Sequence, residues 1–149
     1  MPPAPSRPVS EYLKNRVLAA SPEELRLLLL EGALKFARQG REGLARKDFE
    51  AVFNGLSQCR DVVMELLTTI RTEVDPDLAA KVKALYTFIY TLLVEGGHEK
   101  DLKKVDTAIE LLDFERETWV MLMQKVAEER TTKPTAAPQG ERPALSVQG

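Results

Sequence analysis

The sequence has little of the side-chain chemistry from which most catalytic and metal sites are built. Its 149 residues contain one cysteine, Cys59, and one histidine, His98. A single cysteine excludes an internal disulfide and a thiolate metal cluster, and it is compatible with a reducing compartment. The Gly-x-x-x-x-Gly-Lys loop that cradles phosphates is also missing. We therefore expect no catalytic residue, no metal and no cofactor, in a protein that is not an enzyme.

An excess of charge of one sign and long hydrophobic runs are missing as well. The chain has 21 basic and 23 acidic residues, so it offers no basic surface to nucleic acid or to an anionic membrane. Its longest aliphatic run, residues 27–30, is far shorter than the ~20 residues that span a bilayer. The first residues lack the cationic and apolar regions of a signal peptide. These absences predict a cytoplasmic protein with no nucleic-acid partner and no membrane insertion.

The composition changes sharply near both ends of the chain. Residues 2–8 and 131–149 are rich in Pro, Ala, Thr, Gln and Gly and have few large apolar side chains. Such segments cannot bury enough surface to offset the entropy lost on ordering. We therefore expect a flexible N-terminal tail at residues 1–8, one helical-bundle domain at residues 9–130 and a disordered C-terminal tail at residues 131–149.

Helix signals recur through the expected domain. Ser21 supplies a hydroxyl cap, Pro22 stands at the first helical position, and Glu24 is placed to reach back to the cap. Apolar residues then recur at spacings of three and four until a turn expected around residues 46–47. Asp48 is placed to cap a second helix.

Proline and glycine mark the remaining boundaries. The Asp-Pro-Asp sequence at residues 75–77 predicts the end of the second helix and the start of a third. The glycine pair at 96 and 97 predicts the end of the third helix, and Asp101 is placed to cap a fourth helix. Short connections between amphipathic helices favour antiparallel neighbours. The predicted fold is all-α: an antiparallel up-and-down four-helix bundle with a short additional N-terminal helical segment at residues 9–19.

The chemically distinctive residues have ordinary interpretations. Cys59 lies on the apolar stripe of the second helix, where it is expected to act as a small hydrophobe. His98 follows the glycine pair and is expected in a solvated loop. An alternative from the enzyme class is a histidine phosphotransfer bundle with His98 as the phosphoacceptor. That role requires a histidine exposed on a helix face, for which a glycine loop is a poor place.

Glycine and aromatic positions suggest close packing and an accessible edge. Three glycines, at 32, 40 and 43, fall inside the first helix, where each costs up to about 1 kcal/mol relative to alanine. They indicate close packing or bending around another chain, and the alternative is a tolerated loss of stability. Tyr86, Phe88 and Tyr90 cannot all point into one core, so at least one of them should lie at an edge or a groove.

Several blocks of sequence resemble the FliS family. In residues 12–33, an Asn15-x-Val17 segment runs into Ala-Ser-Pro and a leucine-rich helix with an acidic-Gly-Ala sequence. Residues 85–95 resemble the family's Leu-Tyr-x-Tyr segment, and residues 116–119, Arg-Glu-Thr-Trp, resemble its closing Arg-Asp/Glu-x-Trp. Residues 59–66 fit the second-helix pattern more weakly. The resemblance covers residues 12–126.

The chain departs from the family pattern at three places. Leu30 stands where members commonly have Tyr or Phe, and Ala-Asn is replaced by the glycine pair at 96 and 97. Neither change harms a bundle. Thr91 and Leu92 stand where members commonly have two arginines. The loss of this arginine pair removes a charged contact that a partner could use on that face.

The resemblance implies an export chaperone of the cytoplasm. Such a protein holds newly made flagellin by its C-terminal segment and keeps it unpolymerised until the flagellar type III export apparatus takes it. A flagellin terminus is amphipathic, and a surface that accepts its apolar face blocks its assembly with like chains. The resemblance also implies a component of the export gate as a second partner.

We hypothesise that the segment from Tyr12 to Val17 is a gate that covers part of an apolar groove in the free chaperone and is displaced by the client. The leucine excess on the first helix and the aromatics on the third exceed what one core stripe needs. The candidate gate and groove residues are Tyr12, Asn15, Val17, Leu25, Leu28, Leu29, Gly32, Leu85, Tyr86, Ile89 and Leu93. An alternative is a helical adaptor or self-associating module whose excess apolar surface is its own interface or binds another client.

Overall fold

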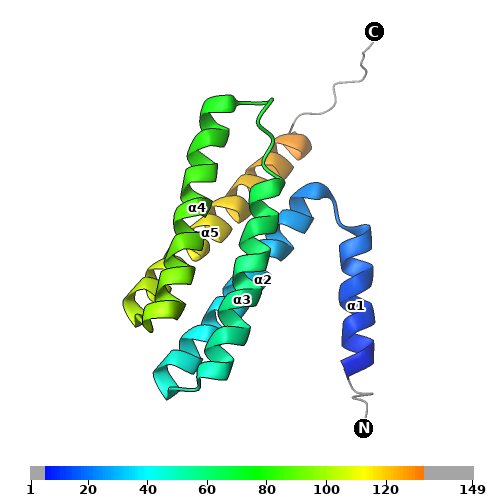
Figure 1. The fold of residues 1–149 in the computed structure, drawn as a ribbon. Helices are drawn as coiled ribbons and strands as arrows, with labels where there is room; N and C mark the ends of the chain where they lie inside the picture. Colours follow the sequence, from blue (N-terminus) through cyan, green and yellow to red (C-terminus); the bar gives the residue numbers. More distant parts are fainter. Residues whose placement is uncertain (1–5, 133–149) are drawn as a thin grey trace. The chain divides into compact units, whose positions relative to one another are not determined.

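The structure, a computed structural model, describes residues 6–132 and contains, within that range, five helices and no strand. The helices are α1 (Ser6–Ala19), α2 (Pro22–Arg46), α3 (Phe49–Thr68), α4 (Pro76–Glu99) and α5 (Leu102–Thr132) (Figure 1). The all-α class is therefore confirmed. Of the tails predicted at residues 1–8 and 131–149, residues 1–5 and 133–149 lie outside the described residues, and residues 131–132 are helical. Residues 6–8, expected in the N-terminal tail, are helical.

The start of α2 and the α2–α3 turn follow the sequence signals. The Ser21 hydroxyl accepts a hydrogen bond from the Glu24 backbone at 3.1 Å, and the Glu24 carboxylate accepts one from the Ser21 backbone at 2.9 Å. Lys47 closes α2 in the left-handed conformation, with φ of 59°. Asp48 then caps α3 by accepting from the Ala51 backbone at 3.2 Å. These caps satisfy amide groups that would otherwise lack partners at the helix ends.

Two predicted helix ends are wrong. The second helix ends at Thr68, not at the Asp-Pro-Asp sequence, and an exposed connection leads to the Asp75 cap of α4. The third helix continues through both glycines to Glu99, and Lys100 ends it in the left-handed conformation with φ of 54°. Gly96 permits close packing instead, because a Cβ there would lie 2.7 Å from a methyl carbon of Val105.

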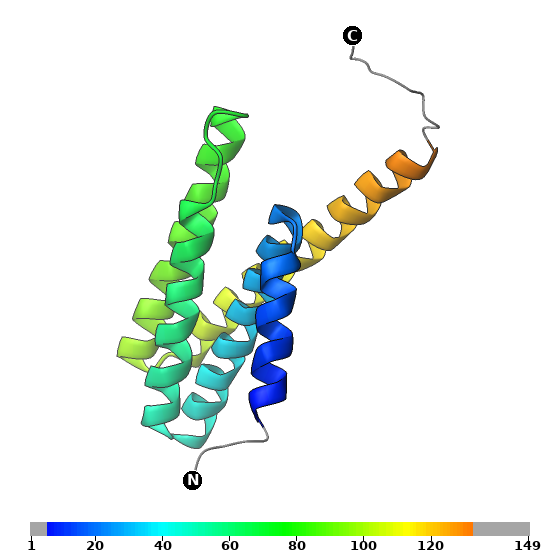
Figure 2. The same ribbon diagram turned by 90° about the vertical axis from the view of Figure 1, so that its right-hand side faces the viewer.

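Helices α2 and α3 approach closely at their glycines. A Cβ built on Gly55 would lie 2.5 Å from the backbone nitrogen of Gly40 and 2.7 Å from the carbonyl oxygen of Phe36. A Cβ on Gly43 would lie 2.8 Å from the backbone nitrogen of Val52. The two helices lie side by side in both views (Figure 1, Figure 2). The glycines predicted to allow close packing therefore do so at 40 and 43, against α3.

The core is formed by small and aliphatic side chains from α2 to α5. Buried apolar residues are Leu30, Ala33, Leu34, Ala37, Val52, Leu56, Cys59, Val63, Leu66, Ala79, Tyr86, Ile89, Leu92, Leu93, Val105, Ala108 and Leu112. They recur at spacings of three and four along each helix, which is the pattern of an amphipathic helix that buries one face.

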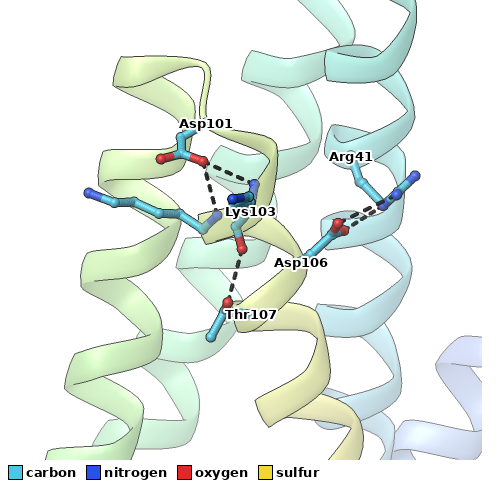
Figure 3. Close-up of polar contacts among 6 residues, drawn as sticks. Arg41, Asp101, Lys103, Asp106 and Thr107 are labelled. Carbon is cyan, nitrogen blue, oxygen red and sulfur yellow. Dashed lines mark hydrogen bonds and ion pairs between the residues drawn. The ribbon is translucent and has the colours of Figure 1, made fainter.

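The first turns of α5 are fixed by polar contacts. The Asp101 carboxylate accepts from the backbone of Lys103 at 3.0 Å and so caps the helix, as predicted (Figure 3). Arg41 of α2 pairs with Asp106 of α5 (Figure 3). Lys104 donates to Glu95 of α4 at 2.8 Å. These contacts hold the start of α5 beside α2 and α4.

The chain divides into two compact units. The first includes the described residues up to Arg116, and the second begins at Glu117. In the second unit α5 continues to Thr132, with Met121, Leu122 and Val126 39–66% exposed. Within residues 6–132, no helix has the length and apolar character needed to cross a membrane.

Candidate binding site

The candidate residues on α2 form one helix face. Leu25, Leu28, Leu29 and Gly32 are spaced at three and four residues, so they lie along the same side of the helix. All four are half-buried. The fully buried positions of this helix, such as Leu30 and Leu34, lie beside them. This face of α2 is therefore partly accessible to a partner, while the neighbouring face packs in the core.

The candidate residues on α4 are mostly in the core. Tyr86, Ile89 and Leu93 have an exposed fraction of 0%, and Leu85 is half-buried. Phe88, by contrast, is 52% exposed, which confirms that the three aromatic residues do not share one core. A partner cannot touch Tyr86, Ile89 or Leu93 in this conformation.

The candidate gate residues on α1 are exposed. Tyr12 is 62% and Val17 45% exposed, and Asn15 is exposed as well. Leu13 and Leu18 add two further exposed apolar side chains to this helix. Isolated helices shorter than about 12–15 residues are marginal in water, so α1 is suited to pack on another surface. In this conformation the gate side chains are not buried.

A polar network connects α2, α3, α4 and α5 at Tyr86. Arg26 donates to the Tyr86 hydroxyl at 3.1 Å and to the Thr69 hydroxyl at 3.1 Å. The Tyr86 hydroxyl in turn donates to a Glu115 carboxylate oxygen at 3.0 Å. The Arg26 guanidinium carbon also lies 5.4 Å from the centre of the Tyr86 ring. Burial raises the pKa of Tyr86 far above its usual value, so the phenol stays protonated and remains the donor to Glu115.

Sequence reasoning missed Arg26 and Glu115, although a signal was present. Arg26 lies four residues before Leu30, on the core face of α2, within a run of leucines. Glu115 lies three residues after Leu112, on the core face of α5. Charged side chains on core faces of two helices indicate a polar partner between them, because an unpaired charge is costly to bury. The partner is the hydroxyl of Tyr86, which the sequence analysis selected as an apolar groove residue and not as a hydrogen-bonding one.

Several large apolar side chains of α3, α4 and their connection are exposed outside the candidate set. They are Phe49, Phe53, Met64, Val74, Leu78, Phe88 and Val94, with exposed fractions of 42–73%. Phe49 and Phe53 lie at the border of the buried face of α3, since they are 47% and 67% exposed. Lys100 covers part of this border, since its ammonium nitrogen is 4.9 Å from the centre of the Phe49 ring.

His98 does not lie in a loop. It is exposed in the last turn of α4, because the helix continues through the glycine pair. The prediction of a solvated side chain is confirmed, but the predicted loop is wrong. A phosphoaccepting histidine must be exposed on a helix, and His98 meets that geometric requirement.

Cys59 is expected to be nearly inert in the folded protein. Its exposed fraction is 0%, and burial raises the pKa of its thiol to about 12. Because the thiolate is the reactive form, labelling by a maleimide or disulfide reagent at pH 8 should be at least about 100-fold slower than in urea. In a Cys59→Ala background, Gln58→Cys provides an exposed control on the same helix. If Cys59 in the folded protein is labelled as fast as the exposed cysteine of the control, the burial of Cys59 is contradicted.

Comparison with known proteins finds that the sequence is similar to flagellar proteins. The family described as "Flagellar protein FliS" matches residues 5–126. A flagellar secretion chaperone FliS of Bacillus subtilis (strain 168) is 29% identical over 126 residues, which cover 83% of this chain and 91% of that protein. A flagellar secretion chaperone FliS of Vibrio cholerae serotype O1 is 23% identical over 105 residues, covering 70% of this chain and 77% of that protein.

Proposed function

Because the chain belongs to the FliS family of flagellar proteins, we propose that it is a cytoplasmic export chaperone that acts by binding and not by catalysis. Its client is the C-terminal helical segment of flagellin. Binding keeps flagellin from polymerising before the flagellar type III export apparatus receives it. The observation that carries this proposal is the match of the family over residues 5–126, which includes every candidate residue.

The accessible apolar face of α2 supports the proposal. Leu25, Leu28 and Leu29 are half-buried and lie on one side of a long helix. An amphipathic client helix can place its own apolar positions against such a stripe, at spacings of three and four residues. A client that orders on binding loses conformational entropy, and a large contact surface offsets that cost.

The exposed residues of α1 support the role of a gate. Tyr12 and Val17 are apolar and exposed, so they are available to cover an apolar surface and to leave it again. We expect a chain lacking residues 1–18 to keep its folded helices and to bind the client with altered affinity. A truncated chain that unfolds would show instead that α1 is a structural staple. Helical content by circular dichroism and a binding titration distinguish the two outcomes.

The export gate is the second proposed partner. Thr91 and Leu92 replace an arginine pair common in the family, and Leu92 is buried while Thr91 is exposed. A charged contact to the gate at these two positions is therefore not part of the proposal. No residue is assigned to this second partner.

The proposal is tested by isothermal titration of the purified chain with flagellin from the same cell. We expect one-to-one binding by full-length flagellin and no binding by flagellin that lacks its C-terminal segment. Leu28→Gln should weaken binding about tenfold, because it removes apolar contact area at the centre of the α2 stripe. Glu31→Gln, at an exposed position of the same helix, is the matched control and should bind as the wild type does.

The titration and two further measurements separate the alternatives. Absence of heat with both forms of flagellin would favour a helical adaptor for another client. A monomer by light scattering would argue against a self-associating module. For the phosphotransfer alternative, incubation with a phosphodonor should leave no acid-labile phosphate on His98.

A further inference from the structure

The first part of α4 is held to the bundle by little apolar burial. Between residues 76 and 85, Ala79 is the one buried side chain, and it has a single methyl group to pack. Leu78 is 57% exposed, and Val82 and Leu85 are half-buried. From Tyr86 onward the same helix buries Ile89, Leu92, Leu93 and Gly96. Since local stability follows buried apolar contact, residues 76–85 should open more easily than the rest of α4.

The connection between α3 and α4 does not hold residues 76–85 to the bundle either. Residues 71–75 are exposed, and Val74 in that connection is 73% exposed. A side-chain hydrogen bond across it joins Lys83 to Thr72 at 3.4 Å, and it is exposed to solvent. An exposed contact of this length adds little stability. By contrast, α2 and α3 meet at backbone distance at Gly40 and Gly55.

The polar network lies where the weakly packed part of α4 meets the buried part. Tyr86 is the first fully buried side chain after Ala79, and its hydroxyl is held by Arg26 from α2 and by Glu115 from α5. Arg26 also holds Thr69, at the C-terminal end of α3. Hydrogen bonds to charged groups are the stronger ones in proteins, and an unsatisfied partner is costly. The network therefore fastens α4 at the boundary between its weakly packed part and its buried part.

We propose that residues 76–85 form a lid that opens by rotating away at Tyr86, and that Arg26 and Glu115 are positioning residues that keep it closed through the Tyr86 hydroxyl. Opening brings Tyr86 to the surface and exposes the half-buried side chains of Val82 and Leu85. Tyr86, a candidate binding residue, is therefore buried when the lid is closed and accessible when the lid is open. The link to a client rests on the proposed function, whereas the lid itself does not.

The lid has a definite consequence for binding. If a client helix binds only the open state, its apparent affinity is reduced by the fraction of molecules that are open. A variant that loosens the network increases that fraction. It should therefore bind the client more tightly, through faster association, although it is less stable. A residue with a merely structural role would weaken binding or leave it unchanged.

The experiment compares Tyr86→Phe with Tyr90→Phe. The first removes the hydroxyl from the network and keeps the ring, and the second removes a hydroxyl from a half-buried tyrosine one turn further along α4. Amide hydrogen exchange is measured on the purified chain without any client. In Tyr86→Phe we expect protection of residues 77–85 to fall about tenfold or more, since hydrogen bonds to charged groups are lost. Protection in α2 and α3 should stay within twofold, and Tyr90→Phe should resemble the wild type. Arg26→Met should reproduce the effect of Tyr86→Phe.

Two results for Tyr86→Phe would contradict the proposed lid: a uniform loss of amide protection over all helices, or unchanged amide protection in residues 77–85. Stopped-flow association with flagellin then tests the link to binding. We expect association to be faster in Tyr86→Phe by about the factor seen in exchange, with a similar dissociation rate. Equal association rates would disprove that link. Failure of the wild type to bind flagellin would instead refute the proposed function, and the exchange result would still decide the lid.

Discussion

Replacing Gly55 with alanine should destabilise the protein by about 2–4 kcal/mol, because the new methyl group overlaps the backbone of α2. Its Cβ would lie 2.5 Å from the Gly40 nitrogen, 2.7 Å from the Phe36 carbonyl oxygen and 2.9 Å from the Gly40 Cα. Backbone atoms cannot turn aside as a flexible side chain can. The two helices must therefore separate, and the core residues beside them lose contact.

Gly32→Ala is the matched control on α2. A Cβ at Gly32 would meet no heavy atom within 4 Å, so the substitution causes no overlap. Alanine in a helix interior is more favourable than glycine, and Gly32→Ala should raise stability by about 0.5–1 kcal/mol. Urea unfolding followed by circular dichroism measures both variants. Equal stabilisation at the two positions would contradict the close packing at Gly55, because helix propensity alone would then determine both effects.

The second large effect is expected at Ile89. This side chain has an exposed fraction of 0%, and Ile89→Ala leaves a cavity in the core. Such substitutions cost about 2–5 kcal/mol, depending on how far the surroundings relax. The neighbouring Phe88 is 52% exposed, and Phe88→Ala should change stability by no more than about 0.5 kcal/mol. Unfolding midpoints in urea provide the comparison.

The same pair of variants distinguishes core from groove on α4. In the closed conformation Ile89 cannot touch a partner, so Ile89→Ala should affect flagellin binding only through the stability of the fold. Titration at low temperature, where the variant remains folded, should then give an affinity within about threefold of the wild type. A large loss of affinity in a fully folded Ile89→Ala protein would place Ile89 in direct contact with the client.

The local features of the helices were predictable because their causes lie within a few residues. Ser21, Asp48 and Asp101 cap the helices that they were expected to cap. A cap depends on a side chain and an amide group two or three residues away, so the necessary information is local. The end of α4 was not predictable in this way. A glycine pair is compatible both with a helix end and with close helix packing, and only the position of Val105 decides between them.

The candidate site was predictable in composition but not in exposure. The leucine face of α2 follows from spacing alone, and its members are half-buried together. On α4 the same reasoning selected Tyr86, Ile89 and Leu93, which are buried. An apolar stripe that is wider than one core contact identifies a helix with two packing faces. It does not tell which face is covered in the free protein.

The all-α class, the starts of α2 to α5 and the family could be predicted from the sequence alone, because each depends on the order and spacing of nearby residues. The tertiary structure decided which stripe residues are buried, and it revealed the contact among Arg26, Tyr86 and Glu115. Tyr86 is 60 positions from Arg26 and 29 positions from Glu115 along the chain. Side chains so distant in sequence meet only when the helices pack, and no local pattern encodes the distance between them.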